Sequence, residues 1–144
     1  MKRIAFIDKI HPALQEGLES LGWICDDLTK NSREEIVDGL KIYHGIVIRS
    51  RFPMNEAFLA HADQLEFIAR SGAGMENIDI SYCKQRGIQL FNAPEGNRNA
   101  VAEHALGMLL SLFNNLSKGD LEIRDGIWDR EGNRGVELDG KVVG

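Results

Sequence analysis

Short apolar runs alternate with amphipathic segments over the first two thirds of the chain. The apolar runs occupy residues 3–7, 23–26, 45–48, 65–69 and 88–91, and turn-forming residues bound each of them. The segments between them, residues 12–21, 32–42, 55–62 and 80–86, have the apolar spacing of helices. Mostly apolar strands that alternate with helices are typical of a parallel sheet covered on both faces. The pattern therefore predicts an α/β fold, a flavodoxin-like, doubly wound parallel sheet of five strands.

Residue types at the ends of the predicted helices agree with this pattern. Gly22 and Gly87 stand where a glycine commonly ends a helix, since glycine adopts the left-handed conformation without steric cost. Asn31, Asn55 and Asp79 stand where a side chain can accept a hydrogen bond from the first free amide groups of a helix. These residues support the predicted helix boundaries.

The pattern changes after Pro94. Residues 101–116 predict a long helix that is apolar on two sides, so we expect it to lie buried between two domains or subunits. Ser117 and Asp120 then resemble a capping box that opens a second helix, which ends near Gly126 and Trp128. Residues 129–135 are expected to form an exposed loop. Residues 137–144 turn apolar again, and residues 141–144 predict the beginning of another buried strand.

Composition and charge narrow the possible functions. A formal net charge of -5 argues against a general nucleic-acid surface, which would be basic. We expect no membrane segment, because no apolar run is long enough to cross a bilayer. The two cysteines lie far apart and no export signal precedes them, which favours reduced thiols in a cytoplasmic protein. Any anionic ligand must therefore be held by local positive groups.

Chemistry in such a fold gathers outside the carboxyl ends of the strands. Arg49 and Arg51 follow the third predicted strand and would share a side if the backbone stays extended. Two guanidinium groups could hold a carboxylate or a phosphate. The alternative is that each is a surface arginine paired with a nearby acid.

The fourth predicted strand is followed by Arg70 and the glycine-rich segment Ser71, Gly72, Ala73 and Gly74. Three interpretations are open: a dinucleotide loop, a plain structural turn, or capture of an anion by backbone amides. Asn77 occupies the place of the last glycine of a dinucleotide loop, and no acidic residue ends the next strand. Anion capture is therefore the favoured interpretation.

Together these loops resemble the D-isomer-specific 2-hydroxyacid dehydrogenases, and within that family the phosphoglycerate dehydrogenase branch. The matching segments are residues 48–51, 70–74, 77–79, 87–88, 92–94, 97, 101–103, 126–128 and 137–141. The resemblance covers nearly the whole chain from the third strand onward. Its motifs are specific in combination, although none is decisive alone.

The resemblance implies two similar α/β domains, the first binding substrate and the second carrying NAD. Residues 1–96 would form the substrate-binding domain. Residues 97–144 would form interdomain helices and the truncated start of a Rossmann domain, ending before its Gly-rich loop. The family's catalytic histidine, its carboxylate partner and an arginine that orients the substrate would all lie beyond residue 144. We therefore expect no catalytic residue and no metal site in this chain, and no activity for the chain alone.

By match of motif, the resemblance places substrate contacts at the two predicted loops and cofactor contacts after the fifth strand. The substrate contacts would come from Arg49, Ser50, Arg51, Arg70, Ser71, Gly72, Ala73 and Gly74. Asn97 and Val101 would face the nicotinamide. The expected ligands are a small anionic 2-hydroxy acid and NAD. The family dimerises around the long helix, so we expect a homodimer or a larger assembly in which Arg130 reaches the partner's site.

Two alternatives belong to other classes. A non-catalytic ligand-binding or regulatory module could keep the same fold, as in corepressors that resemble these dehydrogenases. A receiver-type signalling domain would need an aspartate where Arg49 stands, so this alternative is disfavoured. His104 beside Glu103 looks like an acid/base pair, but adjacent helical residues point in different directions, which favours a structural role.

Overall fold

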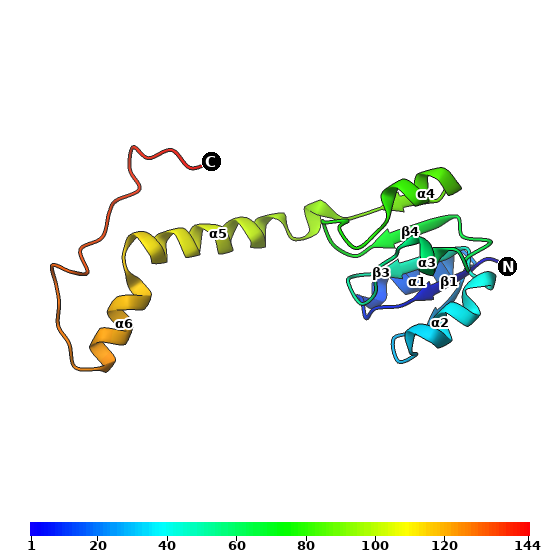
Figure 1. Cartoon of the computed structure of the whole chain (residues 1–144), viewed down its shortest axis with the longest axis horizontal. Coiled ribbons are helices and arrows are strands. Elements are labelled where there is room, and N and C mark those ends of the chain that lie inside the picture. Colours follow the sequence, from blue (N-terminus) through cyan, green and yellow to red (C-terminus); the bar gives the residue numbers. More distant parts are fainter. The chain divides into compact units, whose positions relative to one another are not determined.

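The computed structural model describes all residues from 1 to 144 and divides them into two compact units, Met1–Asn97 and Arg98–Gly144 (Figure 1). The expected domain boundary, after residue 96, lies one residue from this division. The roles assigned to the two parts remain predictions.

The first unit contains a five-stranded sheet in which every pairing is parallel. Its strands are β1 (Arg3–Phe6), β2 (Ile24–Asp27), β3 (Gly45–Ile48), β4 (Phe67–Arg70) and β5 (Gln89–Phe91). They lie in the order β2-β1-β3-β4-β5, which confirms the flavodoxin-like sheet. β1 and β3 are neighbours while β2 lies on the other side of β1, so the chain changes direction across the sheet between them.

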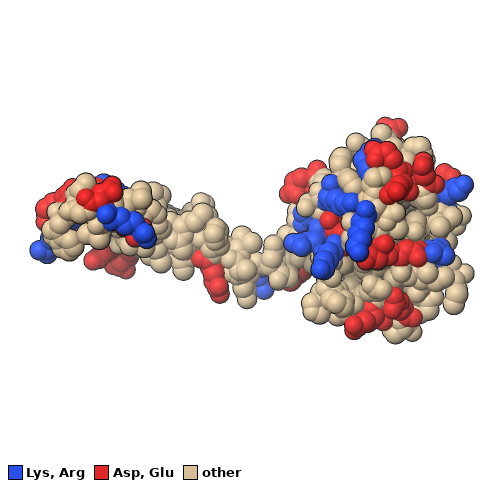
Figure 2. Space-filling model, turned by 90° about the horizontal axis from the view of Figure 1, so that it is seen from below, with Lys and Arg blue, Asp and Glu red and all other residues tan.

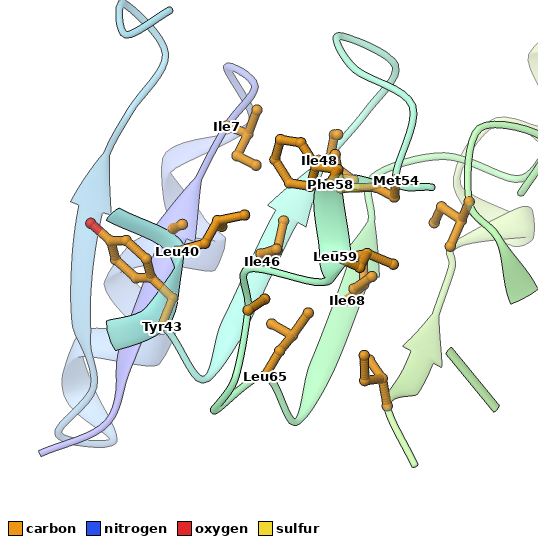
Figure 3. Close-up of a cluster of buried hydrophobic side chains, with 14 of the residues drawn as sticks. Ile7, Leu40, Tyr43, Ile46, Ile48, Met54, Phe58, Leu59, Leu65 and Ile68 are labelled. Atoms are coloured by element: carbon orange, nitrogen blue, oxygen red, sulfur yellow. The ribbon is translucent and has the colours of Figure 1, made fainter. Parts of the chain in front are cut away.

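Helices cover the two faces of this sheet unequally. They are α1 (Pro12–Ser20), α2 (Arg33–Gly39), η1 (Leu40–Ile42), α3 (Glu56–Leu59), α4 (Ile80–Arg86) and η2 (Pro94–Gly96). The larger core cluster joins the strands to α2, α3 and α4. In Figure 3, Phe58 and Leu59 of α3 lie against Ile46, Ile48 and Ile68 of the central strands. The smaller cluster lies on the opposite face, where α1 contributes Leu18. Burial of these aliphatic side chains is the main stabilising contribution.

Side chains at the helix ends confirm some of the predicted caps and correct one. Asn55 caps α3 and Asp79 caps α4, as expected. Hydrogen bonds from Ser81 and from the Tyr82 amide lower the pKa of Asp79. The prediction for Asn31 is wrong, because Ser32 caps α2 and forms a capping box with Glu35. Serine and asparagine are about equally good caps, so adjacent candidates cannot be ranked by residue type.

The second unit contains α5 (Arg98–Phe113) and α6 (Leu116–Arg124). The predicted capping box at Ser117 and Asp120 is wrong, because Asn115 precedes α6 in a left-handed conformation with φ of 52°. The Ser117 hydroxyl lies inside the first turn, 3.4 Å from the Ser111 hydroxyl oxygen.

Residues after α6 run without a regular helix or strand. The exposed loop predicted at 129–135 is confirmed as a series of turns. The buried strand predicted to begin at residues 141–144 does not form within this chain, since residues 137–144 pair with no other strand and almost all are exposed. An apolar run becomes a buried strand only where a neighbouring strand accepts its hydrogen bonds.

None of the side chains in the second unit is fully buried. The apolar residues of α5 are spread around the helix, and many of them are exposed. None of the helices in the chain combines the length and the apolar character that a membrane crossing needs.

Candidate anion-binding site

The loops that follow β3 and β4 leave the sheet side by side. Ile48 is paired with Arg70 in the β3–β4 register, so Arg49 and Ser71 follow neighbouring strand ends. The Ser71 amide donates to the Ile48 carbonyl oxygen at 2.8 Å and holds the two loops together. The structure therefore brings the two segments predicted to bind substrate to one edge of the sheet.

Basic residues accumulate at this edge although the chain is acidic overall. Lys9, Lys30, Arg49, Arg51 and Arg70 each end one of the first four strands or lie within three residues of its end. Figure 2 shows Lys and Arg side chains gathered on one side of the first unit. It is the side at which the strand arrows of Figure 1 end. This concentration supplies the local positive groups that an anionic ligand requires.

The Arg51 guanidinium group is engaged within the protein. It donates to the carbonyl oxygens of Ile7 (3.1 Å), Leu28 (3.2 Å) and Asn31 (2.6 Å). It also lies 4.7 Å from the centre of the Phe52 ring, within range of a cation–π interaction. Arg51 thus ties the ends of β1 and β2 to the loop after β3, and these contacts argue against a primary role in holding substrate.

The Arg49 side chain has no such engagement. Arg49 is exposed, and its guanidinium group forms neither a hydrogen bond nor an ion pair. An extended backbone predicts that the Arg49 and Arg51 guanidinium groups share one side. The structure does not bring these two groups together. Arg49 remains free to contact an anion.

The amide groups of the loop after β3 are already occupied. Asp8 Oδ2 accepts hydrogen bonds from the amides of Arg49, Ser50 and Arg51. Sequence analysis missed Asp8, although Asp8 lies two residues beyond the end of β1, just as Ser50 lies two residues beyond the end of β3. Ser50 thus has no free backbone donor to offer a ligand.

The glycine-rich loop after β4 keeps two free amides. The amides of Ser71 and Gly72 donate to the carbonyl oxygens of Ile48 and Arg70, but those of Ala73 and Gly74 have no acceptor. The loop is held from β5, because the Asn92 side chain donates to the Ala73 carbonyl oxygen at 2.7 Å. Two successive free amides in a fixed loop can bind an anion.

Arg70 lies over this loop. Its Nε is buried and has no acceptor, an uncommon state for a charged donor. Its guanidinium group is so close to Gly72 that a Cβ atom there would collide with it. The Glu76 carboxylate is similarly close to the Gly74 Cα atom, so one negative charge borders the site. The edge thus combines free donors with nearby acids, of which Glu76 borders the glycine-rich loop and Asp8 is bound to the amides after β3.

Asn77 connects the two loops. Its side-chain Nδ2 donates to the carbonyl oxygens of Arg49 (3.3 Å) and Phe52 (3.4 Å). Its backbone carbonyl oxygen accepts from the Met54 amide at 2.7 Å. Sequence analysis treated this residue as a departure from a dinucleotide loop and as part of the matching segment 77–79, and it assigned Asn77 no role in holding the loops. A polar side chain that cross-links two loops leaves no periodic pattern, so the sequence alone could not identify its role.

The glycine-rich loop does not suit a dinucleotide pyrophosphate. A dinucleotide loop leads from a strand directly into a helix whose first amides face the phosphates. Here a bridge between Met54 and Ile78 follows the loop, and α4 begins only at Ile80. This geometry supports the preference for anion capture.

The remaining predicted residues stay untested. Asn97 ends the first unit, whereas Val101 is an exposed residue of α5 in the second, so their nicotinamide contacts remain predictions. Glu103 and His104 are exposed and form no hydrogen bond with each other. The chain contains no group of three acidic, histidine or cysteine side chains placed to hold a metal ion.

Comparison with known proteins gives one family. The family model for the catalytic domain of D-isomer specific 2-hydroxyacid dehydrogenases matches residues 4–135. A D-3-phosphoglycerate dehydrogenase of Archaeoglobus fulgidus is 38% identical over 116 residues, which are 81% of this chain and 22% of that protein. The chain spans about a quarter of the length of the curated relatives it matches.

Solved structures agree with this match. A crystal structure of a protein from Pyrococcus horikoshii aligns with a TM-score of 0.84 at 24% identity, over 98% of this chain and 44% of that chain. A 3-phosphoglycerate dehydrogenase of Entamoeba histolytica, solved with bound NAD+, aligns with a TM-score of 0.63 at 30% identity. That alignment covers 78% of this chain and 39% of that chain.

Proposed function

Since the chain belongs to the D-isomer specific 2-hydroxyacid dehydrogenase family, we propose that it is the substrate-binding part of an NAD-dependent oxidoreductase. The proposed reaction is the oxidation of 3-phosphoglycerate to 3-phosphohydroxypyruvate. The D-3-phosphoglycerate dehydrogenases among its relatives support this choice of substrate. In this reaction a hydride leaves C2 of the hydroxy acid as its hydroxyl group loses a proton.

One observation carries the proposal: unused donors lie on the two adjacent loops after β3 and β4. The buried Arg70 Nε and the amides of Ala73 and Gly74 have no acceptor, and the Arg49 guanidinium group has no partner. Of these donors only Arg70 Nε is buried, and buried donors are nearly always satisfied in a folded protein, so this atom indicates a missing acceptor. An anionic substrate group would supply it.

The donors differ in what they contribute to binding. Arg49 and Arg70 provide positive charge and planar, forked donors that match a carboxylate or a phosphate. The amides of Ala73 and Gly74 come from a loop held by Asn92, so they are oriented before the ligand arrives. Ser50, Arg51, Ser71 and Gly72 shape these two loops in the proposed site.

NAD is the proposed cofactor of the whole protein, in which it would accept the hydride. The glycine-rich loop of this chain does not fit the NAD pyrophosphate. Asn97 and Val101 are proposed to contact the nicotinamide side, as the family resemblance implies. We also propose a homodimer or a larger assembly, which the exposed apolar residues of α5 support.

Calorimetric titration of the chain with D-3-phosphoglycerate tests the substrate assignment. We expect saturable binding that weakens with salt and is about tenfold or more weaker in Arg49→Ala. Arg33→Ala is the control, since Arg33 is a partly buried arginine at the start of α2, outside these loops. Equal binding by the wild type and Arg49→Ala, or no binding at all, would contradict the proposed site.

A further inference from the structure

The amides after β3 surround a carboxylate that belongs to the chain itself. Asp8 Oδ2 accepts from the amides of Arg49 at 2.6 Å, Ser50 at 3.0 Å and Arg51 at 3.2 Å. These are the only hydrogen bonds of the Asp8 side chain, and it has no ion-pair partner. One oxygen atom that faces three successive amides has the arrangement of an anion-binding nest.

We propose that Asp8 acts as a built-in anion that closes the nest after β3 and so directs the ligand's anionic group to the amides of Ala73 and Gly74. That Asp8 closes the nest rests on the three hydrogen bonds alone. That it directs the ligand to Ala73 and Gly74 rests also on the proposed function. Asp8 is thus a specificity-determining residue at a site where two amide nests lie on neighbouring loops.

The tethered carboxylate has two advantages over a free anion. Asp8 is fixed two residues beyond β1, next to β3 in the sheet, so it occupies the nest without the loss of translational freedom that a free anion suffers. Its negative charge also repels a second anion from the same amides. A phosphate or carboxylate in solution is therefore excluded from the nest after β3.

The same contacts position Arg49. Asp8 holds the Arg49 amide, and Asn77 Nδ2 holds the Arg49 carbonyl oxygen at 3.3 Å. Both backbone polar groups of Arg49 are therefore engaged, and only its guanidinium group is left for a ligand. Asp8 fixes the backbone from which this side chain extends and does not itself contact the ligand.

Amide-resolved NMR of the chain titrated with inorganic phosphate tests the inference. In the wild type we expect phosphate to shift the amide resonances of Ala73 and Gly74 and to leave those of Arg49, Ser50 and Arg51 unchanged. In Asp8→Ala, a second, saturable set of shifts appears at these three amides, and acetate produces it as well. In Asp8→Asn the set stays absent, because the amide oxygen of the new side chain still fills the nest.

Asp27→Asn is the matched control. Asp27 lines the same surface hollow as Asp8, but its carboxylate accepts from Thr29 and not from the amides after β3. This variant removes one negative charge at the same edge without opening the nest, so it should leave the three amides unresponsive. Unchanged dispersion of the core resonances verifies the fold of each variant.

The two proposals fail in different ways. If the three amides of folded Asp8→Ala respond to phosphate no more than in the wild type, the nest inference is overturned. If the amides of Ala73 and Gly74 do not respond in the wild type, the proposed substrate site is wrong. Even in that second case, the amide resonances of Arg49, Ser50 and Arg51 in Asp8→Ala still show whether the nest binds phosphate.

Discussion

Arg49 and Arg51 stand two positions apart, yet their guanidinium groups have different surroundings. Arg51 donates to three backbone carbonyl groups, whereas Arg49 donates to none. We therefore expect Arg51→Ala to lower the free energy of unfolding by roughly 2 kcal/mol, because it leaves partly buried carbonyl groups without their donor. Arg49→Ala should leave stability within about 0.5 kcal/mol of the wild type. Urea denaturation of both variants measures this difference, and equal stabilities would contradict the assigned roles.

Glu76 provides a second test of the site's electrostatics. Its carboxylate lies beside Gly74, whose free amide is proposed to hold the ligand. Glu76→Gln removes this repulsion, so we expect anion affinity to rise by about twofold to fivefold at low salt, and less at high salt. Glu56→Gln, at the start of α3, is a control for the loss of one negative charge elsewhere. A similar gain in both variants would show that only net charge matters.

The sequence predicted where these residues lie, because they follow predicted strands. It did not predict which groups their side chains contact. The positions of Arg49, Arg70 and the glycine-rich loop follow from the strand pattern. The engagement of Arg51 depends on carbonyl groups that are 20 to 44 residues away in the chain. No local periodicity encodes such contacts, and the same holds for Asp8 and the loop after β3.

The start of α2 shows how small differences between adjacent residues decide an element's boundary. Ser32 and Glu35 form a reciprocal pair of hydrogen bonds there, whereas the Asn31 side chain forms none. We expect Ser32→Ala to lower stability by about 1 kcal/mol. Asn31→Ala should have little effect, because the Asn31 backbone carbonyl that accepts from Arg51 is retained. Thermal unfolding of the two variants distinguishes the caps, and a larger loss for Asn31→Ala would contradict this assignment.

The strands were more predictable than the segment after α6. Short apolar runs predicted all five strands within two residues of their observed starts, and their parallel order followed from the helices between them. The apolar run after residue 137 is similar in composition but has no neighbouring strand. Composition indicates a tendency to be buried, and pairing decides whether a strand forms.

The second unit exposes apolar residues that a stable surface rarely leaves uncovered. Leu112 is 73% exposed and Trp128 is 81% exposed. We expect the chain to self-associate through this unit, since burying such residues removes apolar surface from water. Sedimentation velocity over a range of concentrations measures this. Leu112→Gln should weaken association, whereas Leu14→Gln in α1 of the first unit should not. A monomer at every concentration would contradict the expectation.

We propose that the edge formed by the loops after β3 and β4 binds the substrate of a D-2-hydroxyacid dehydrogenase. The most direct measurement is NADH formation by the product of the complete coding sequence, with D-3-phosphoglycerate as substrate. We predict turnover in the wild type, and in Arg49→Ala a KM raised about tenfold or more through loss of a charge-assisted contact. Absence of turnover with any D-2-hydroxy acid, in a folded protein that still binds the ligand, would contradict the claim and favour a non-catalytic binding module.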